Sequence, residues 1–344
     1  MSQPLELGLD TFGDVTIDTT GKALHHAEVL RNIVAEADLA DQVGLSFFGV
    51  GEHHRDDFAV SAPEVVLAAI ASRTKNIHLG SAVTVLSSDD PVRVFQRFST
   101  LDALSNGRAE VIIGRGSFTE SFPLFGLDLN QYELLFNERL ELFAEILKEG
   151  SITWSGKTRG AMKDQRVYPP TESGRLRTWI GVGGTPASVA RAAHYGFPLM
   201  LAIIGGDPMG FVPYAEYYRN ALKELGREQL PIGAHSPGHI AATDQQAKEE
   251  LWPHFQAMHS RIGRERGWPA LTPQAFEQMA GPNGALCVGS PETVAAKIIR
   301  TTKALGLSRF DLKYSAGTLP HAQLMKSIEL YGTQVVPLVR AQLN

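Results

Sequence analysis

The stretch Leu45-Ser46-Phe47-Phe48-Gly49-Val50 is a short, mostly apolar run of the kind that forms a buried β-strand. A second run, Ile77 to Val83, follows it along the chain. Between them, Ser61-Ala62-Pro63-Glu64 resembles a helix start, with a hydroxyl at the cap and proline in the first turn. A strand, a helix and another strand in this order predict two parallel strands joined by a helix.

This order repeats along the whole chain. Apolar or β-branched runs of strand length alternate with stretches of helical spacing. The runs are Leu5 to Thr11, Leu45 to Val50, Ile77 to Val83, Arg108 to Arg115, Thr178 to Val182, Phe197 to Ile204, Pro231 to Thr243 and Arg309 to Ser315. Eight strands alternating with helices favour a closed (β/α)8 TIM barrel over an open, doubly wound sheet. Because such barrels reach this size as one domain, residues 1–344 are predicted to form a single barrel with insertions.

Other helices carry start signals as well. Asn130 to Lys148 has apolar residues at helical spacing, and Asn130 with Glu133 resembles a capping pair. Thr185-Pro186 and Ser290-Pro291 again place a hydroxyl before a proline. Helices are therefore expected to begin at each of these positions.

Two segments are longer than ordinary connections between strands and helices. Residues 150–177 follow the fourth strand and are expected to form an irregular or hairpin excursion. Residues 258–289 are expected to form a long insertion before the last helix and strand. Loops of this length are commonly lids or binding loops, although simple decoration of the barrel is an alternative for both segments.

Composition narrows the classes of function. The chain has 32 basic and 37 acidic residues, a net charge of −5, and no basic block, so nucleic acid is not an expected partner. Its longest apolar run is too short to cross a membrane. The single cysteine, Cys287, excludes an internal disulfide framework. With no secretory signal in the first residues, a cytoplasmic location is expected.

Candidate active-site residues are expected at the carboxyl ends of the strands, because barrel enzymes place reacting groups on the loops that follow their strands. Four loops stand out for their glycine, histidine and charged residues. They are Gly51 to Asp57, Ala82-Val83-Thr84, Gly114-Arg115-Gly116-Ser117 and Gly183-Gly184-Thr185-Pro186. If the barrel is correct, all four meet at one mouth.

Gly183-Gly184-Thr185 before a helix offers free backbone N–H groups, a hydroxyl and the positive end of a helix dipole, which suit a phosphate group. Arg115, between two glycines, would add a charged contact. Each signal alone is weak, since a glycine pair before a helix is more often a simple turn. Neither of the glycine-rich nucleotide motifs, GxGxxG or GxxxxGK[ST], is present.

His53 and His54 invite a metal site, but adjacent residues of a strand point to opposite sides, and no further ligands are evident. No metal is therefore expected. Cys287 has no local signature of a nucleophile, and a buried structural role is the better interpretation.

The same loops resemble a known family. Matching stretches run in the same order from about residue 5 to residue 340. They include Gly51-Glu52-His53-His54, Ile77 to Leu86 with Asp90-Pro91-Val92-Arg93, Leu101 to Arg108, Gly114 to Phe118, Phe122 to Gly126, Gly183 to Ser188, Gly196 to Met200, Val288 to Glu292 and Ser327 to Leu330. Together they resemble the bacterial luciferase-like, flavin-dependent monooxygenase family, and in particular the luciferase α subunit.

The resemblance implies a (β/α)8 barrel that binds reduced flavin mononucleotide (FMN) at its mouth. It also implies a role for individual residues. The flavin phosphate is held at Arg115, Gly184, Thr185 and Ser188; Ala82 and Val83 form a cis peptide behind the flavin ring; and His53 assists acid–base steps. Gly116, Ser117 and Gly183 are also expected to bind the cofactor. Residues from Met258 onward match a mobile lid. From their predicted places at strand ends, Asp10, Phe12, Val83 and residues 202–204 are expected to line the ring.

The chain departs from the luciferase pattern at two positions. Gly114 stands where the luciferase α subunit has a reactive cysteine, and Gly184 replaces an acidic residue at the phosphate site. Flavin binding remains expected, but light emission is not.

The best-supported hypothesis is a two-component oxidoreductase that uses reduced FMN and O2 to oxidise a small organic substrate, a reaction of paired donors with incorporation of oxygen. A separate flavin reductase would supply the reduced FMN. Hydride transfer with the deazaflavin F420 and a flavin-binding protein without turnover are the alternatives. The resemblance further implies a homodimer, formed through the helices after the second and third strands.

Overall fold

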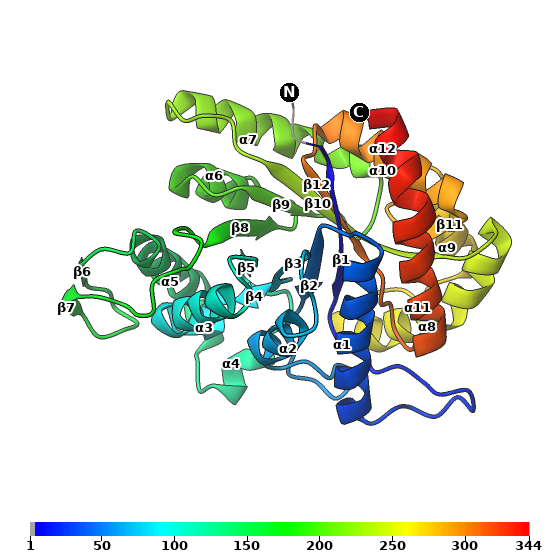
Figure 1. The fold of residues 1–344 in the computed structure, drawn as a ribbon, viewed down its shortest axis with the longest axis horizontal. Coiled ribbons are helices and arrows are strands. Elements are labelled where there is room, and N and C mark those ends of the chain that lie inside the picture. Colours follow the sequence, from blue (N-terminus) through cyan, green and yellow to red (C-terminus); the bar gives the residue numbers. More distant parts are fainter. Residues whose placement is uncertain (1–3, 344) are drawn as a thin grey trace.

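The computed structural model describes residues 4–343, and its strands close into a barrel (Figure 1). Eight parallel strands form a ring, because β9 pairs with β10, β10 with β12 and β12 with β1. In ring order they are β1 (Glu6–Thr11), β2 (Phe47–Val50), β3 (His78–Ser81), β5 (Ala109–Gly114), β8 (Arg177–Val182), β9 (Leu199–Ala202), β10 (Ile232–Ile240) and β12 (Arg309–Lys313). The predicted (β/α)8 barrel and all eight predicted strands are confirmed.

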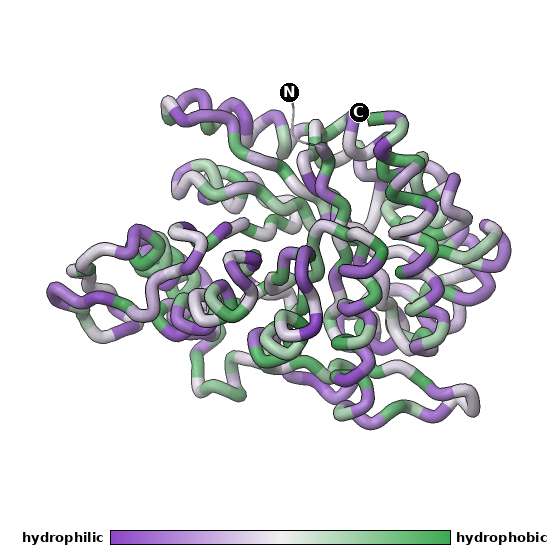
Figure 2. Tube along the Cα trace, in the orientation of Figure 1, coloured by the Kyte–Doolittle hydropathy of each residue, from purple (hydrophilic) through white to green (hydrophobic). Residues whose placement is uncertain are grey.

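Helices surround the ring (Figure 1). The principal helices are α1 (His26–Gln42), α2 (Pro63–Ala71), α3 (Pro91–Leu104), α5 (Tyr132–Ile146), α6 (Pro186–Tyr195), α7 (Val212–Glu224), α8 (Asp244–Arg266), α10 (Pro291–Leu305), α11 (His321–Leu330) and α12 (Val336–Leu343). Shorter pieces are α4 (Ser121–Leu124), α9 (Pro273–Ala280), β4 (Thr84–Val85) and β11 (Cys287–Gly289). Hydrophobic colour lies mainly along the strands and the inner helix faces, and hydrophilic colour along the projecting loops (Figure 2).

The predicted excursion at residues 150–177 contains a hairpin. Strands β6 (Ile152–Trp154) and β7 (Met162–Gln165) pair antiparallel and project away from the barrel (Figure 1). The predicted insertion at residues 258–289 is less irregular than expected. Its first nine residues continue α8 to Arg266, and α9 and β11 follow. Whether this segment moves as a lid stays a prediction.

The predicted helix caps are correct only in part. Ser290 accepts a hydrogen bond from the N–H of Thr293, as expected. Helix α2 has Ala62 at its cap and no capping side chain, so a role for Ser61 is wrong. The capping pair of Asn130 and Glu133 is also wrong, because the preceding turn is capped by Asp128 and the carboxylate of Glu133 binds arginine.

Side chains fill the interior of the barrel below its mouth. Phe47, Ile112, Trp179 and Met200 form an apolar cluster inside the ring. Towards the amino ends of the strands, the fully buried Arg309 lies 3.4 Å from the centre of the Phe47 ring and donates a 2.7 Å hydrogen bond to Glu110. The centre is therefore a packed core, and a ligand must bind above it, at the carboxyl ends of the strands.

Candidate active site

Loops that follow β2, β3, β5 and β8 meet at the mouth, as the sequence predicts. The N–H of Val85 lies 3.4 Å from Glu52, and the hydroxyl of Ser87 donates to the carbonyl of Arg115 at 3.3 Å. Glu133 then links Arg115 to Arg191 of α6, the helix that follows β8. These contacts join the four motifs into one site.

Glycines shape the floor of this mouth. The Ala82–Val83 peptide is cis, as the resemblance implies. A Cβ atom on Gly114 would lie 2.5 Å from Cγ2 of Val83, and one on Gly181 would lie 3.2 Å from its Cγ1. Two strands therefore need glycine so that the Val83 side chain can lie across them. Glycine at position 114 has a steric reason here, since a side chain would collide with Val83.

His53 lies in an aromatic corner of the mouth. Its ring centre is 5.3 Å from that of Phe12, 4.4 Å from Phe58 and 4.7 Å from Phe118. Its Nδ1 atom lies 3.6 Å from Oε1 of Glu120. Burial raises the pKa of Glu120, but the interaction with His53 and hydrogen bonds from the backbone of Glu120 and His54 together outweigh burial and lower that pKa below its usual value. His53 therefore has a carboxylate close to one nitrogen in otherwise apolar surroundings.

His54 faces a different partner. Its Nε2 atom lies 2.9 Å from Glu52, and Glu52 in turn receives the N–H of Val85. The two adjacent histidines thus have separate roles, one at the mouth and one tying two loops together. Within residues 4–343, no three histidine, cysteine or acidic side chains are grouped as metal ligands.

A second corner of the mouth is rich in positive charge and hydroxyl groups. Arg115 binds Glu133, whose other oxygen lies 3.4 Å from Nη2 of Arg191. The hydroxyl of Thr185 donates to that of Ser188 at 2.8 Å at the start of α6, and the Thr185 side chain caps no backbone N–H of this helix. With two guanidinium groups, two hydroxyls and an uncapped helix start against a single carboxylate, this corner suits an anion.

The glycines of this corner differ in their roles. Gly116 and Gly184 have φ angles of +71° and +105°, which favour glycine over other residues. A Cβ atom on Gly183 would meet no other atom within 4 Å, so space is open beside it. The side chain of Ser117 is exposed, and only its carbonyl is engaged, by Arg266 at 2.9 Å. Ser117 therefore lies under α8 and is not drawn to the anion corner by any contact.

The carboxyl end of α8 crosses the mouth. Arg55, from the loop after β2, donates to Glu265 of α8 at 2.6 and 2.7 Å. Arg261 lies 3.0 Å from Asp57 of the same loop. The guanidinium of Arg266 lies 4.5 Å from the centre of the Phe118 ring. Charged contacts at the surface thus hold this end of α8 over the two loops that carry His53 and Phe118.

A buried hydrogen-bonded pair of side chains, His235 and Asp10, lies at the mouth and is not predicted from the sequence. Nδ1 of His235, on β10, lies 2.6 Å from Oδ2 of Asp10, on β1. Phe12 stacks on His235 with its ring centre 5.9 Å away. Asp10 and Phe12 were expected near the ring, but His235 was not among the predicted site residues. Ile203 is buried in the outer core, so it does not line the mouth as expected.

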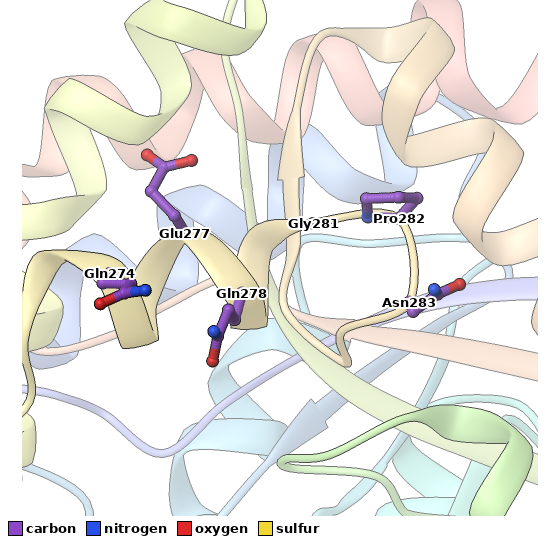
Figure 3. Close-up of a pocket in the computed structure, with 6 residues that line it drawn as sticks. All are labelled: Gln274, Glu277, Gln278, Gly281, Pro282 and Asn283. Carbon is purple, nitrogen blue, oxygen red and sulfur yellow. The ribbon is translucent and has the colours of Figure 1, made fainter.

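The structure also has surface hollows away from the mouth. One of about 540 Å³ lies between α9 and the turn that follows it (Figure 3). It is lined by Gln274, Glu277, Gln278, Gly281, Pro282 and Asn283. None of these residues was a candidate for the site. Cys287, on the strand that follows, is buried, and burial raises its pKa to about 11, in agreement with a structural role.

Residues 11–309 match the family model described as luciferase-like monooxygenase. The chain belongs to this family. Limonene 1,2-monooxygenase of Rhodococcus erythropolis is 25% identical over 95% of this chain and 87% of its own length. In this member of the family, residues 4–343 include no helix that is both long and apolar enough to cross a membrane.

Two solved structures share the fold at low identity. The oxygenating constituent of 3,6-diketocamphane monooxygenase from Pseudomonas putida, in complex with FMN, superposes with a TM-score of 0.77 and 19% identity, over 97% of this chain and 99% of that one. Coenzyme F420-dependent tetrahydromethanopterin reductase from Methanopyrus kandleri gives a TM-score of 0.72 and 19% identity, over the same shares. The family fold thus occurs with both cofactors.

Proposed function

We propose that this protein is an FMN-dependent monooxygenase that uses reduced FMN and O2 to oxidise a small organic substrate. The observation that carries the proposal is that one mouth combines a corner suited to an anion with a floor on which glycines leave room for the Val83 side chain. A planar ring that bears a phosphate fits both features at once. The monooxygenase names of the family and of the limonene relative support oxygenation.

Each corner of the mouth would hold one part of the cofactor. Arg115, Thr185 and Ser188 would bind the phosphate, together with the backbone of Gly116 and Gly184. The ring would rest against Ala82 and Val83. When bound, reduced FMN supplies the reaction with O2. The protein supplies binding, orientation and the exclusion of water.

Residues around the ring would manage protons and water. His53 would take up or return a proton at a nitrogen of its own imidazole ring. Glu120, beside Nδ1 of His53, would stabilise the imidazole when it is charged. Phe12, Phe58 and Phe118 surround it and keep bulk water from this corner. The contacts of α8 would close the mouth while the substrate reacts.

Hydride transfer with F420 is the second candidate. Its support is the F420-dependent reductase with the same fold. The anion corner alone does not separate the two cofactors, because both carry a phosphate group. Loss of turnover with retained flavin binding is the third possibility, and the intact surroundings of His53 speak against it.

Cofactor titration and isotope incorporation test the proposal together. The purified protein is titrated anaerobically with reduced FMN and with F420 while flavin fluorescence is followed, and it is then exposed to 18O2 with a panel of neutral and charged organic compounds. We expect tighter binding of reduced FMN than of F420, and one 18O atom in a product. Tighter binding of F420 with no 18O incorporated would select hydride transfer instead.

Two partners belong to the proposal. A separate reductase would supply reduced FMN, and a second copy of the chain would pack against α2 and α3. Val65 on α2 is 70% exposed and Leu104 on α3 is 62% exposed, so both helices present apolar side chains to solvent. Light scattering of the wild type and of Val65→Lys tests the dimer; a wild-type monomer would contradict it.

A further inference from the structure

Asp10 is a buried carboxylate with only one side-chain partner. It is 1% exposed, and its Oδ2 atom lies 2.6 Å from Nδ1 of His235. Its other oxygen, Oδ1, is buried and has no hydrogen-bond partner among residues 4–343. The nearby cation Lys313 is engaged elsewhere, since its Nζ lies 3.1 Å from Asp14. A buried charge is costly unless it is paired, so this arrangement needs an explanation beyond packing.

The hydrogen bond to Asp10 fixes the state of the His235 ring. An ionised carboxylate only accepts hydrogen bonds, so Nδ1 of His235 must carry a proton and donate it to Asp10. In the neutral ring, Nε2 is then a bare acceptor. No side chain or backbone group within residues 4–343 bonds to this atom, and the residue is 9% exposed. His235 therefore presents an unused basic nitrogen from a fixed ring.

His235 shares its surroundings with the mouth residues already described. Phe12 lies between the two histidines, stacked on His235 at 5.9 Å and edge-on to His53 at 5.3 Å. A Cβ atom on Gly49 would lie 3.0 Å from the Cβ atoms of both Asp10 and Ala82. Asp10 is thus at the level of the floor on which the flavin ring would rest, across the barrel from the anion corner.

We propose that His235 is a second proton-transfer residue of the mouth, with Asp10 as its positioning residue; this rests on the proposed function. Nε2 accepts a proton from the molecule bound above it, while the Nδ1 proton stays between the ring and Asp10. The positive ring formed in this way lies beside a carboxylate that has no other cation, which stabilises it. The proton later returns to the product or to water, so no group is consumed.

Charged groups on the neighbouring strands also face this pair. Asp311 and Lys313 come from β12, which lies between β1 and β10. The backbone of Asp311 is in register with that of His235, and Lys313 has its Nζ 4.6 Å from the centre of the Phe12 ring. A pH profile of the site therefore reports the titration of all these groups together. Only replacement of His235 itself shows which part of the profile belongs to His235.

The first test measures which nitrogen of the His235 ring is protonated, and it does not require turnover. Long-range 15N–1H NMR of the unliganded protein is expected to show His235 protonated at Nδ1, and Asp10→Asn is expected to change that state. Saturation with FMN is expected to shift the Nε2 resonance of His235, while the resonances of His239 stay in place. Protonation at Nε2, or no shift with FMN bound, would overturn the proposal.

The second test uses matched variants of one strand. His235→Asn keeps an N–H for Asp10 but removes Nε2, and His239→Asn is the control, because His239 is also buried on β10 and lies 2.7 Å from a carboxylate, that of Glu250. We expect His235→Asn to bind FMN within about twofold of wild type, to lower kcat by roughly 100-fold, and to lose the limb of the pH profile in which kcat falls as pH is lowered, because Nε2 must be unprotonated to accept a proton.

The outcomes of the two tests are separable. Wild-type kcat and an unchanged pH profile in His235→Asn would refute this inference while leaving the proposed function in place. Failure of the wild type to bind either FMN or F420 would refute the proposed function instead. The tautomer of His235, measured without ligand, would then still decide whether Asp10 orients the ring.

Discussion

Replacing Arg115 by alanine is expected to weaken the binding of FMN while leaving the binding of riboflavin, which lacks the phosphate, unchanged. Charge-assisted hydrogen bonds contribute about 1.5–3 kcal/mol each. In the wild type this gain is reduced by the cost of breaking the ion pair between Arg115 and Glu133, which FMN must displace. Its side chains are 28% and 56% exposed, and such pairs contribute about 0–1 kcal/mol. The net loss is therefore about 0.5–3 kcal/mol, a rise in Kd of roughly 2- to 150-fold.

Fluorescence titration of both ligands against the two proteins measures this difference. Arg73→Ala is the matched control, because Arg73 also has an exposed ion pair, 3.6 Å from Asp38, but lies beyond the far end of α2. The melting temperature of Arg115→Ala should stay close to that of wild type, since only a surface pair is lost. Equal weakening of FMN and riboflavin, or no weakening of FMN, would refute the assignment of Arg115 to the phosphate.

Three further predictions follow from contacts around the mouth and the core. Glu133→Gln should tighten FMN binding about two- to fivefold, because the carboxylate no longer competes for Arg115; weaker binding in a titration would contradict this. Glu265→Gln should speed hydrogen exchange at the end of α8 without lowering global stability, because its pair with Arg55 is at the surface; unchanged exchange would show that the pair does not hold the helix. Burial raises the pKa of Cys287 to about 11, which leaves about 0.1% thiolate at pH 8. Alkylation at pH 8 should therefore be at least about 100-fold slower in the folded protein than in urea, and faster as pH rises towards 11; equal rates in the two states would contradict the burial.

The barrel could be predicted because its signals are local. Each strand is an apolar run, and Pro186 and Pro291 mark helix starts within two residues of the observed caps. The mouth motifs were found for the same reason, since the carboxyl ends of parallel strands must meet at one end of a barrel.

Other features depend on contacts between residues far apart in the sequence, which local spacing does not predict. Asp10 and His235 are 225 positions apart and meet only because β12 brings β1 and β10 to the same side of the ring. The arginines and glycines of residues 258–289 form a mixed polar pattern that predicts an insertion, although α8 continues to Arg266. Those charges are satisfied by the loops of the mouth, so they stabilise a helix that the local pattern does not indicate.

A crystal structure of the protein soaked with FMN tests the central claim most directly. We predict the phosphate within hydrogen-bonding distance of Arg115, Thr185 and Ser188, and the flavin ring against Val83. An ordered FMN whose phosphate lies elsewhere, or whose ring does not contact Val83, would contradict the account.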